Sequence, residues 1–447
     1  MPWDIIVIGA GAAGLLAAAR AGERGLRTLL LEKNPHAGVK ILMSGGTRCN
    51  ITQATDKRGI IQAYGDQGPF LHSALALLDP PGVVQLFEDE GVATKVEETG
   101  KIFPVSDKAS DVLAALVRRL QRSGAELALD EAVTDMQLES ALRRNCGAGV
   151  LPADCSITHA GETPAPQPTN GFVVTTVHRT LHANKLIVTV GGKSYPGCGT
   201  SGDGYAWLAA FGHTIVPPRP ALTPVTTHAE WVRELKGVTM PDVFVRVLPA
   251  DAVDGPAGQR RKHVLAERRG SLLFTHFGLS GPVVLDVSRV ISGHPQPHSL
   301  VLVCDFCPDV SVEQLDEALR RDAIADGKKQ IVGLLLRHVP RRLAETLLVQ
   351  SGVTPTLRAA ELSKRDRLRL VEAIKQLRIP VAGTMGFRKA EVTAGGVALD
   401  EVDSHTMQSK LVPNLYLAGE ILDLDGPIGG YNFQAAFSTG MLAGESV

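Results

Sequence analysis

The most constraining feature of the sequence is a glycine-rich turn between two short apolar segments at the amino terminus. Residues 4–8 (DIIVI) have the β-branched composition of a strand, and the motif GAGAAG follows over 9–14. A helical pattern over 15–24 and a second strand over 27–31 complete the unit, which ends at Glu32. This order of strand, turn, helix and strand, with an acid 18 residues after the last glycine, predicts a dinucleotide-binding site.

Each part of the motif has a physical role in binding a pyrophosphate. Gly9 permits the tight turn, Gly11 lets backbone N–H groups approach the phosphates, and Gly14 lets the helix pack closely against the strand. Ala13 belongs to the same predicted set and lies near the helix N-terminus, which carries partial positive charge. Glu32 can accept hydrogen bonds from a ribose 2′-hydroxyl and would repel a 2′-phosphate. The sequence therefore predicts FAD or NAD rather than NADP.

A second glycine loop separates these two cofactors. Residues 40–52 contain the glycine pair 45–46 with a basic residue close by, a pattern that favours a second anion-binding loop. Folds that bind only NAD seldom need a loop at this place, so we expect FAD. The further cofactor-binding residues predicted in this part of the chain are Lys33, Lys40, Gly45, Arg48 and Asn50.

The carboxyl-terminal part contains another short strand that ends in glycine and an acid. The strand is expected over 415–417, and a glycine-rich segment over 426–430 precedes a helix predicted over 433–441. The N–H groups at the start of that helix are expected to face the flavin pyrimidine or the ribityl chain. The cofactor-binding residues predicted here are Gly419, Glu420, Gly430, Tyr431 and Asn432.

Six segments spread over more than 400 residues carry a family resemblance. They are GAGAAG, GGTRCNIT, VGGKSYPGCGTSGDGY, LFTHFGLSGP, KAEVTAGGV and YLAGEILDLDGPIGGYN. In this order they resemble the bacterial YhiN/BaiN-like family of FAD-binding oxidoreductases, also described as aminoacetone-oxidase-type flavoproteins. The resemblance implies an α/β fold: a discontinuous Rossmann-type FAD-binding domain of the two-dinucleotide-binding type, with an inserted β-barrel domain and a small helical subdomain.

The same resemblance implies the domain boundaries. The FAD-binding domain is expected to comprise 1–195 and 380–447, with a β-rich, barrel-like domain over 196–310 and a helical subdomain over 311–379. FAD is expected to be tightly bound without a covalent link.

Two more cofactor contacts are implied in the middle of the chain. A strand near Val133 resembles the one that touches adenine with backbone atoms in related folds, and Gly191 follows the strand that leaves the first half of the domain. Residues 197–202 also match G-x-G-x-x-G, but Pro196 prevents the preceding strand from running straight into this turn. We therefore expect NAD(P)H to bind transiently over the flavin as electron donor, without a Rossmann domain of its own.

The chain departs from the family at two places. Thr47 stands where relatives usually have a glycine before Arg48. A long polar insertion occupies roughly 139–170, and its proline-rich stretch 163–168 cannot pack as strand or helix. We expect the insertion to be a solvated excursion.

Two residues are candidates for chemistry beside the flavin. Cys49 lies next to Arg48, whose charge is expected to lower the thiol pKa, although an inert buried cysteine is an equally physical interpretation. His276 lies beside a shaped Gly-Leu-Ser-Gly-Pro turn, where catalysis or substrate contact competes with a role as a satisfied core residue. On resemblance alone, further pocket residues are Tyr195, Lys389 and Tyr431.

Charge is unevenly distributed along the chain. Residues 256–380 contain 20 Lys or Arg and 13 Asp or Glu, although the whole chain has a net charge of −1. Such a basic insert is able to follow the phosphate backbone of RNA, while a solvated helix face is the ordinary alternative. The resembled family includes a ribosomal RNA dihydrouridine synthase and a bile-acid enone reductase, both of which add hydride to an activated C=C bond.

These observations predict an FAD-dependent, NAD(P)H-consuming reductase whose favoured substrate is a uridine of large-subunit ribosomal RNA. The alternatives are a small-molecule enone reductase or amine oxidase, and a non-catalytic FAD-binding RNA assembly factor. Flavin reduction by NAD(P)H separates the enzymes from the assembly factor.

Other classes of protein are not favoured. The longest apolar run, residues 5–19, is too short to span a bilayer and lacks basic flanks, so we expect a cytoplasmic protein that binds no membrane. Six cysteines in so long a chain do not suggest a disulfide framework, and the single C-x-x-C at 304–307 has no second pair for a zinc site. No metal is expected.

Overall fold

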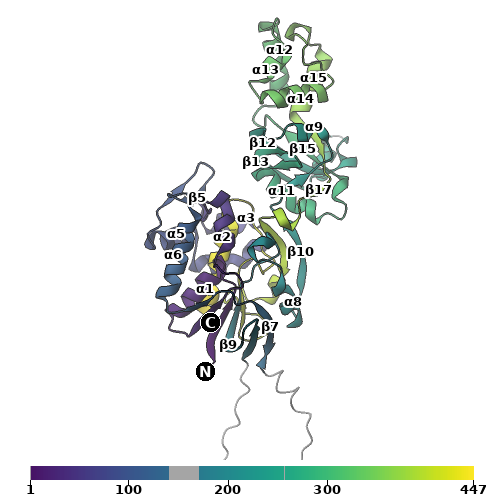
Figure 1. Cartoon of the computed structure of the whole chain (residues 1–447). Helices are drawn as coiled ribbons and strands as arrows, with labels where there is room; N and C mark the ends of the chain where they lie inside the picture. The colour runs from purple at the N-terminus through teal and green to yellow at the C-terminus, as the bar shows by residue number, and fades with distance from the viewer. Residues whose placement is uncertain (1, 140–170, 256) are drawn as a thin grey trace, which may run out of the picture. The chain divides into compact units, whose positions relative to one another are not determined.

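The computed structural model describes residues 2–139, 171–255 and 257–447, so the predicted polar insertion lies almost wholly outside the described residues. The chain forms two compact units (Figure 1). Unit 1 comprises Met1–Pro218 and Thr393–Val447, and unit 2 comprises Arg219–Val392. The chain leaves unit 1 along β10 (Ile215–Ala221) and returns along β18 (Val392–Val397).

These boundaries lie later in the chain than the predicted ones at 195 and 380. Helix α8 (Asp203–Ala210) was expected in the insert, but its Leu208 is fully buried in the core of unit 1. Strand β16 (Leu377–Pro380) and the short β17 (Gly383–Thr384) pair within the sheet of unit 2.

Unit 1 is built on a seven-stranded mixed sheet. Its order is β6-β2-β1-β9-β8-β7, with β19 pairing β9 as well. The parallel strands are β1 (Trp3–Ile8), β2 (Thr28–Leu31), β6 (Glu126–Ala128), β9 (Thr180–Val188) and β19 (Leu415–Leu417). The antiparallel strands are β8 (Phe172–Thr176) and β7 (Val133–Leu138). Because β1 is central, Ile5, Ile6 and Val7 are fully buried, as expected for a strand covered on both faces.

Two helices, α1 (Ala12–Glu23) and α16 (Tyr431–Ser446), pack closely against each other beside this sheet. Glycines in α16 make the close approach possible. A Cβ on Gly440 would lie 2.3 Å from the carbonyl oxygen of Ala13. The remaining helices of unit 1 are α2 (Val39–Met43), α3 (Lys57–Ala63), α4 (His72–Leu77), α5 (Pro80–Asp89) and α6 (Ala109–Arg122). A small antiparallel sheet is formed by β3 (Thr52–Gln53), β5 (Lys101–Pro104) and β4 (Thr94–Val96).

Unit 2 contains a second seven-stranded sheet of order β16-β15-β12-β13-β14-β11-β17. The strands not yet given are β11 (Val225–Thr226), β12 (Thr239–Pro249), β13 (Ala266–Thr275), β14 (Gly278–Ser280) and β15 (Leu300–Asp305). The path has two ends, so the predicted barrel is not closed by hydrogen bonds among the described strands. Helix α11 (Pro282–Gly293) packs on this sheet, and α9 (Glu230–Glu234) and α10 (Ala257–Lys262) are short.

Four helices of unit 2 gather beyond the sheet, at the top of Figure 1. They are α12 (Val312–Ala325), α13 (Ile331–Leu335), α14 (Arg341–Gln350) and α15 (Lys364–Lys375). All four lie between residues 311 and 379, the range over which a helical subdomain was expected.

No single helix in the described ranges has the length and apolar character to cross a bilayer, and one bent pair, Gly65–Leu77 with Pro80–Asp89, passes on length and composition alone. The four cysteines that the structure describes are buried free thiols: Cys49, Cys198, Cys304 and Cys307.

Candidate functional site

Four parallel strands of unit 1 end at the same edge of the sheet. The register pairs Ile8 with both Leu31 and Val188, and Val188 with Leu417. The segments that follow these strands, which we call the strand-end site, are 9–14, 32–34, 189–194 and 418–420. Ligands of open α/β sheets bind at this edge, at the carboxyl ends of the strands.

The first glycine motif forms a tight loop with an open space in front of it. Gly9 has φ +97°, and its N–H donates to the carbonyl of Leu31 at 2.8 Å. A Cβ on Gly14 would lie 1.9 Å from the carbonyl oxygen of Gly9, whereas a Cβ on Gly11 would meet nothing within 4 Å. Ala13 is buried in the first turn of α1, where no side chain caps the helix. The loop therefore offers uncapped N–H groups and room for a pyrophosphate.

Glu32 is held firmly at the end of β2. One carboxylate oxygen, Oε2, accepts from the N–H of Ala10 at 2.9 Å. The other, Oε1, accepts from the N–H and the side-chain amide of Asn34 at 3.0 and 2.7 Å. The N–H of Glu131 donates to the carbonyl of Glu32 at 2.8 Å, which brings the segment leading to Val133 beside the acid. Glu32 and the segment that leads to Val133 therefore lie side by side at this edge of the sheet.

The Lys33 ammonium group is paired within unit 1. Its Nζ contacts Ser201 Oγ at 2.7 Å and Asp203 Oδ2 at 2.8 Å. The side chain of Asn34 also donates to the carbonyl of Cys198 at 3.1 Å. The second G-x-G-x-x-G segment, 197–202, is thus fastened to residues 33 and 34, and Gly191 lies close to it through Thr200.

Lys40 and Glu420 neutralise each other. Lys40 Nζ lies 2.5 Å from Glu420 Oε2 and 2.7 Å from Ser194 Oγ. Glu420 Oε1 accepts from Ser194 Oγ at 2.6 Å and from the N–H of Thr393 at 2.8 Å. Ser194 is fully buried, and the network joins four segments of unit 1 that are distant in sequence, around residues 40, 194, 393 and 420. Sequence reasoning proposed Lys40 and Glu420 but missed Ser194 and Thr393.

The second glycine loop has a left-handed backbone. Gly45 and Gly46 have φ of +55° and +66°, and Thr47 and Cys49 follow with +70° and +60°. Glycine adopts this region freely, but a β-branched residue is strained there. Thr47, which is β-branched, is therefore a strained residue of this loop.

Arg48 does not act on the neighbouring thiol as predicted. Its guanidinium donates to Glu97 at 2.6 Å, contacts Asp107 at 3.4 Å and lies 4.0 Å from the centre of the Phe103 ring. The positive charge of Arg48 is therefore compensated by the carboxylates of Glu97 and Asp107. Cys49 is fully buried, and burial raises its pKa to about 12, opposite to the expected lowering.

The side chain of Asn50 has a buried oxygen that suggests a bound ligand. Its side chain is buried, and its Oδ1 has no hydrogen-bond partner among the described residues. Buried polar atoms are nearly always paired, so this acceptor fits a donor supplied by a bound group. Tyr205, on α8, has a similarly unpartnered buried hydroxyl, and burial together with Glu420 and Asp423 raises its pKa. Tyr205 was not predicted as a site residue, although it ends one of the family-like segments.

The start of α16 is open like that of α1. Gly430 has φ +93°, a Cβ there would lie 2.5 Å from the backbone of Thr52, and no side chain caps the helix. Tyr431 accepts at its carbonyl from the hydroxyl of Tyr64 at 3.0 Å. Asn432 closes the preceding loop through both the N–H and the carbonyl of Gly426, at 2.8 and 2.9 Å. Gly419, with φ +77°, donates to Thr439 Oγ1 at 3.0 Å.

His276 belongs to unit 2. It lies exposed in the turn between β13 and β14, with its ring edge against Phe277 at 4.9 Å between centroids. Cys49 belongs to unit 1. The two predicted catalytic residues are thus in different units.

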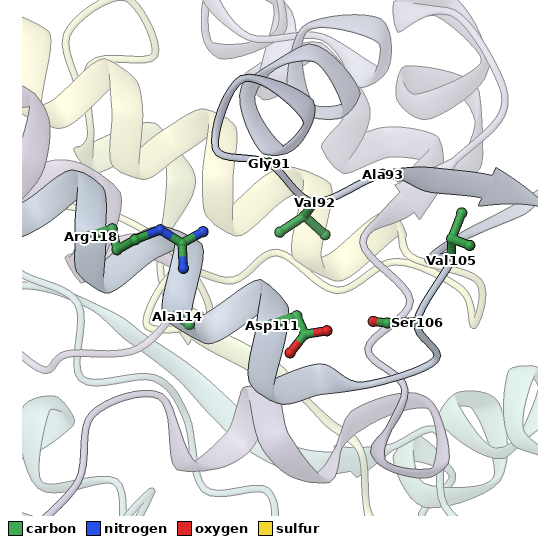
Figure 2. A pocket seen from close by; sticks show the side chains of 8 residues that line it. All are labelled: Gly91, Val92, Ala93, Val105, Ser106, Asp111, Ala114 and Arg118. Atoms are coloured by element: carbon green, nitrogen blue, oxygen red, sulfur yellow. The ribbon is translucent and has the colours of Figure 1, made fainter.

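A separate hollow of about 440 Å³ lies on unit 1, between the end of α5, the β4 and β5 segments and α6. Asp111 and Arg118 project toward it from α6, opposite Val92 (Figure 2). It contains none of the predicted cofactor residues. The described residues contain no group of three or more His, Cys, Asp or Glu that could hold a metal ion.

Unit 1 therefore fits FAD. The strand-end site combines the uncapped start of α1, an open space at Gly11 and the anchored Glu32, which suit a dinucleotide. The uncapped start of α16 and the unpartnered buried acceptor of Asn50 lie outside the strand-end site and fit further groups of the same cofactor.

Comparison with known proteins gives matches over the length of the chain. The family described as HI0933-like protein Rossmann domain matches residues 3–167 and 159–446. The ribosomal RNA dihydrouridine synthase of Escherichia coli is 34% identical over 441 residues, which cover 98% of this chain and 96% of that protein. The enzyme of the same name from Haemophilus influenzae is 31% identical, covering 97% and 96%. The 3-dehydro-bile acid delta(4,6)-reductase of Clostridium scindens is 29% identical, covering 98% of each chain.

Proposed function

Because the chain belongs to the HI0933-like family, we propose that it reduces the C5–C6 double bond of a uridine in large-subunit ribosomal RNA. It is an FAD-dependent oxidoreductase with a Rossmann-type cofactor domain. The observation that carries the proposal is the similarity to two ribosomal RNA dihydrouridine synthases, at 34% and 31% identity over nearly the full length of all three proteins.

The chemistry of the proposed reaction defines what the chain must supply. In uracil, C5=C6 is conjugated with the carbonyl at C4, so hydride adds to C6 and a proton adds to C5. FAD, when bound and reduced by NAD(P)H, would supply the hydride. The protein has to hold the pyrimidine, exclude water and deliver the proton.

Cys49 is the proposed proton donor. Because burial raises its pKa to about 12, the thiol carries its proton throughout the physiological pH range. It lies next to Asn50, the buried acceptor assigned above to the cofactor. A thiol in that place can protonate a carbanion next to the flavin, since a carbon anion is a far stronger base than a thiolate. His276, the other residue predicted to be catalytic, stays a candidate for catalysis or substrate contact.

Unit 2 is the proposed RNA-binding part. It contains 26 Lys or Arg and 19 Asp or Glu, so it is basic, whereas the rest of the chain contains 20 and 28. A polyanion gains affinity from such a surface through release of counterions, and a small neutral substrate does not.

A second candidate function has its own support. The similarity to a bile-acid reductase, 29% identical over 98% of both chains, favours reduction of a conjugated enone in a small molecule. The electronic demand is the same, because hydride adds to the carbon β to a carbonyl in both cases. Only the substrate differs.

The decisive experiment is a mass-spectrometric comparison of ribosomal RNA from a wild-type strain and a strain that lacks this protein. We expect one uridine of the large-subunit RNA to carry two additional hydrogens in the wild type alone. The same nucleoside mass in both strains would reject the RNA substrate and leave the enone as the better one.

A further inference from the structure

The structure separates the basic residues of unit 2 into two groups. In the first group, arginine side chains form ion pairs or hydrogen bonds within unit 2. Arg367, with a side chain only 11% exposed, contacts Asp316 at 2.6 Å, and Arg342 donates to the backbone carbonyls of Glu234 and Lys236. Three exposed arginines pair with an acid on their own helix: Arg320 with Glu317, Arg341 with Glu345, and Arg369 with Asp366.

The second group is exposed and gathers in two segments that flank the helices. We call it the basic edge; its members are Lys328, Lys329, Arg358, Lys364 and Arg365. Within the described part of the chain, Lys328, Lys364 and Arg365 form no hydrogen bond or ion pair, while Lys329 contacts Asp326 at 3.0 Å. Lys328, Lys364 and Arg365 are therefore able to bind an external anion without first losing an internal partner.

Backbone hydrogen bonds place the two segments together. Gln330 and Arg358 form an antiparallel bridge, and the N–H of Ala359 donates to the carbonyl of Lys329 at 2.9 Å. The N–H of Ala360 donates to the carbonyl of Gly327 at 3.1 Å. Segments 326–330 and 358–365, distant in sequence, thus form one edge with five basic and two acidic residues.

Two of these cations lie where the helix dipole disfavours positive charge. Ser363 caps α15 by accepting from the N–H of Asp366 at 3.1 Å, so Lys364 and Arg365 occupy the first turn of the helix together with the acid Asp366. The N-terminus of a helix carries partial positive charge, which disfavours cations there and favours anions. An anion bound at this turn would therefore be attracted by both the cations and the helix.

We propose that the basic edge is the docking surface for the sugar–phosphate backbone of the RNA substrate, an inference that rests on the proposed function. Lysine and arginine side chains that neutralise phosphates fix an RNA in place without reading its sequence. The basic edge therefore holds the RNA, and selection of the uridine belongs to the cofactor unit. The paired arginines contribute little to this contact because their charge is cancelled locally.

Two triple variants of the full-length FAD-loaded protein test the proposal. The first is Lys328→Gln, Lys364→Gln and Arg365→Gln, on the basic edge. The second, a matched control, is Arg320→Gln, Arg341→Gln and Arg369→Gln, which removes the same three charges from paired positions. Binding to an unmodified large-subunit ribosomal RNA transcript is measured from low to high salt, and uridine reduction is measured in parallel.

We expect the basic-edge variant to bind with a log–log salt slope flatter by about 2, since each lost phosphate contact removes about 0.7. KM for the transcript should rise while kcat at saturating RNA stays unchanged. The melting temperature should not fall, because cations leave a helix N-terminus. The control variant should change the slope by less than half as much.

The binding measurement decides the docking surface, and the reduction measurement decides the function. An unchanged slope in the basic-edge variant, or an equal change in both variants, would overturn the docking surface even if the wild type reduces uridine. A wild type that binds the transcript through the basic edge but reduces no uridine would retain the docking surface and reject the proposed function.

Discussion

Unit 1 and unit 2 offer their ligands different kinds of chemical group. The strand-end site of unit 1 consists mainly of backbone N–H groups and glycines. At Gly14, even one added methyl group would collide with the backbone. The basic edge of unit 2 consists of long exposed side chains around one bridge and one helix start. A single added Cβ should abolish ligand binding at a site made of backbone groups. A charged surface should instead lose affinity step by step, as individual contacts are removed.

The largest expected effect is the loss of FAD when a side chain fills the space at Gly11. Gly11→Val should abolish FAD binding yet leave the apo fold intact, since a Cβ there meets no protein atom within 4 Å. Flavin absorbance relative to protein absorbance, together with the melting temperature of the apoprotein, measures both outcomes.

The neighbouring Gly14 provides the contrast. Gly14→Ala places a Cβ 1.9 Å from the carbonyl of Gly9, so it should destabilise the fold by about 3 kcal/mol. If Gly11→Val retained a full complement of FAD, the pyrophosphate would lie elsewhere.

Local spacing made the first half of the site predictable. The turn at Gly9, the close contact at Gly14 and the anchored Glu32 all lie within one strand–helix–strand unit. The residues that interact there are therefore close together in the sequence. The two open helix starts were likewise predicted from glycines beside apolar segments.

The partners of the charged residues were not predictable, because they are distant in sequence. Arg48 contacts Glu97 and Asp107, and Lys33 contacts Asp203. The sequence shows a cation beside a glycine loop in both cases, but only the fold shows that an acid already neutralises it.

The next largest effect concerns the proposed proton donor within unit 1. Cys49→Ala should lower the rate of substrate reduction by about 100-fold, the lower range for loss of a general acid. The rate of flavin reduction by NAD(P)H should be unchanged, since that half-reaction needs no proton for C5. Stopped-flow measurement of the two half-reactions separates them. Equal rates for variant and wild type in both would make Cys49 a packing residue.

A smaller effect is expected from the strained loop residue. Thr47→Gly should raise the free energy of unfolding by about 1 kcal/mol, because it relieves a left-handed β-branched residue and this gain exceeds the added entropy of the unfolded chain. Gly46→Thr, at φ +66° with open space around it, is the matched opposite and should destabilise by a similar amount. Urea unfolding of both variants measures the two changes; a destabilised Thr47→Gly would show that the side chain is held by contacts.

The smallest effect is expected from a single charge in unit 2. Arg365→Gln should flatten the salt dependence of RNA binding by about 0.7, the value for one phosphate contact, and leave FAD content unchanged. Fluorescence anisotropy across a salt series measures the slope. A complete loss of RNA binding from this one change would contradict the contrast between the two units.

The central claim is that this FAD-loaded chain reduces a uridine of large-subunit ribosomal RNA. It is tested most directly by incubating the wild-type protein anaerobically with NAD(P)H and an unmodified transcript of that RNA, followed by digestion to nucleosides and mass spectrometry. We expect one dihydrouridine per transcript, formed with consumption of one NAD(P)H. Oxidation of NAD(P)H by a conjugated enone, with no dihydrouridine formed in the transcript, would contradict it.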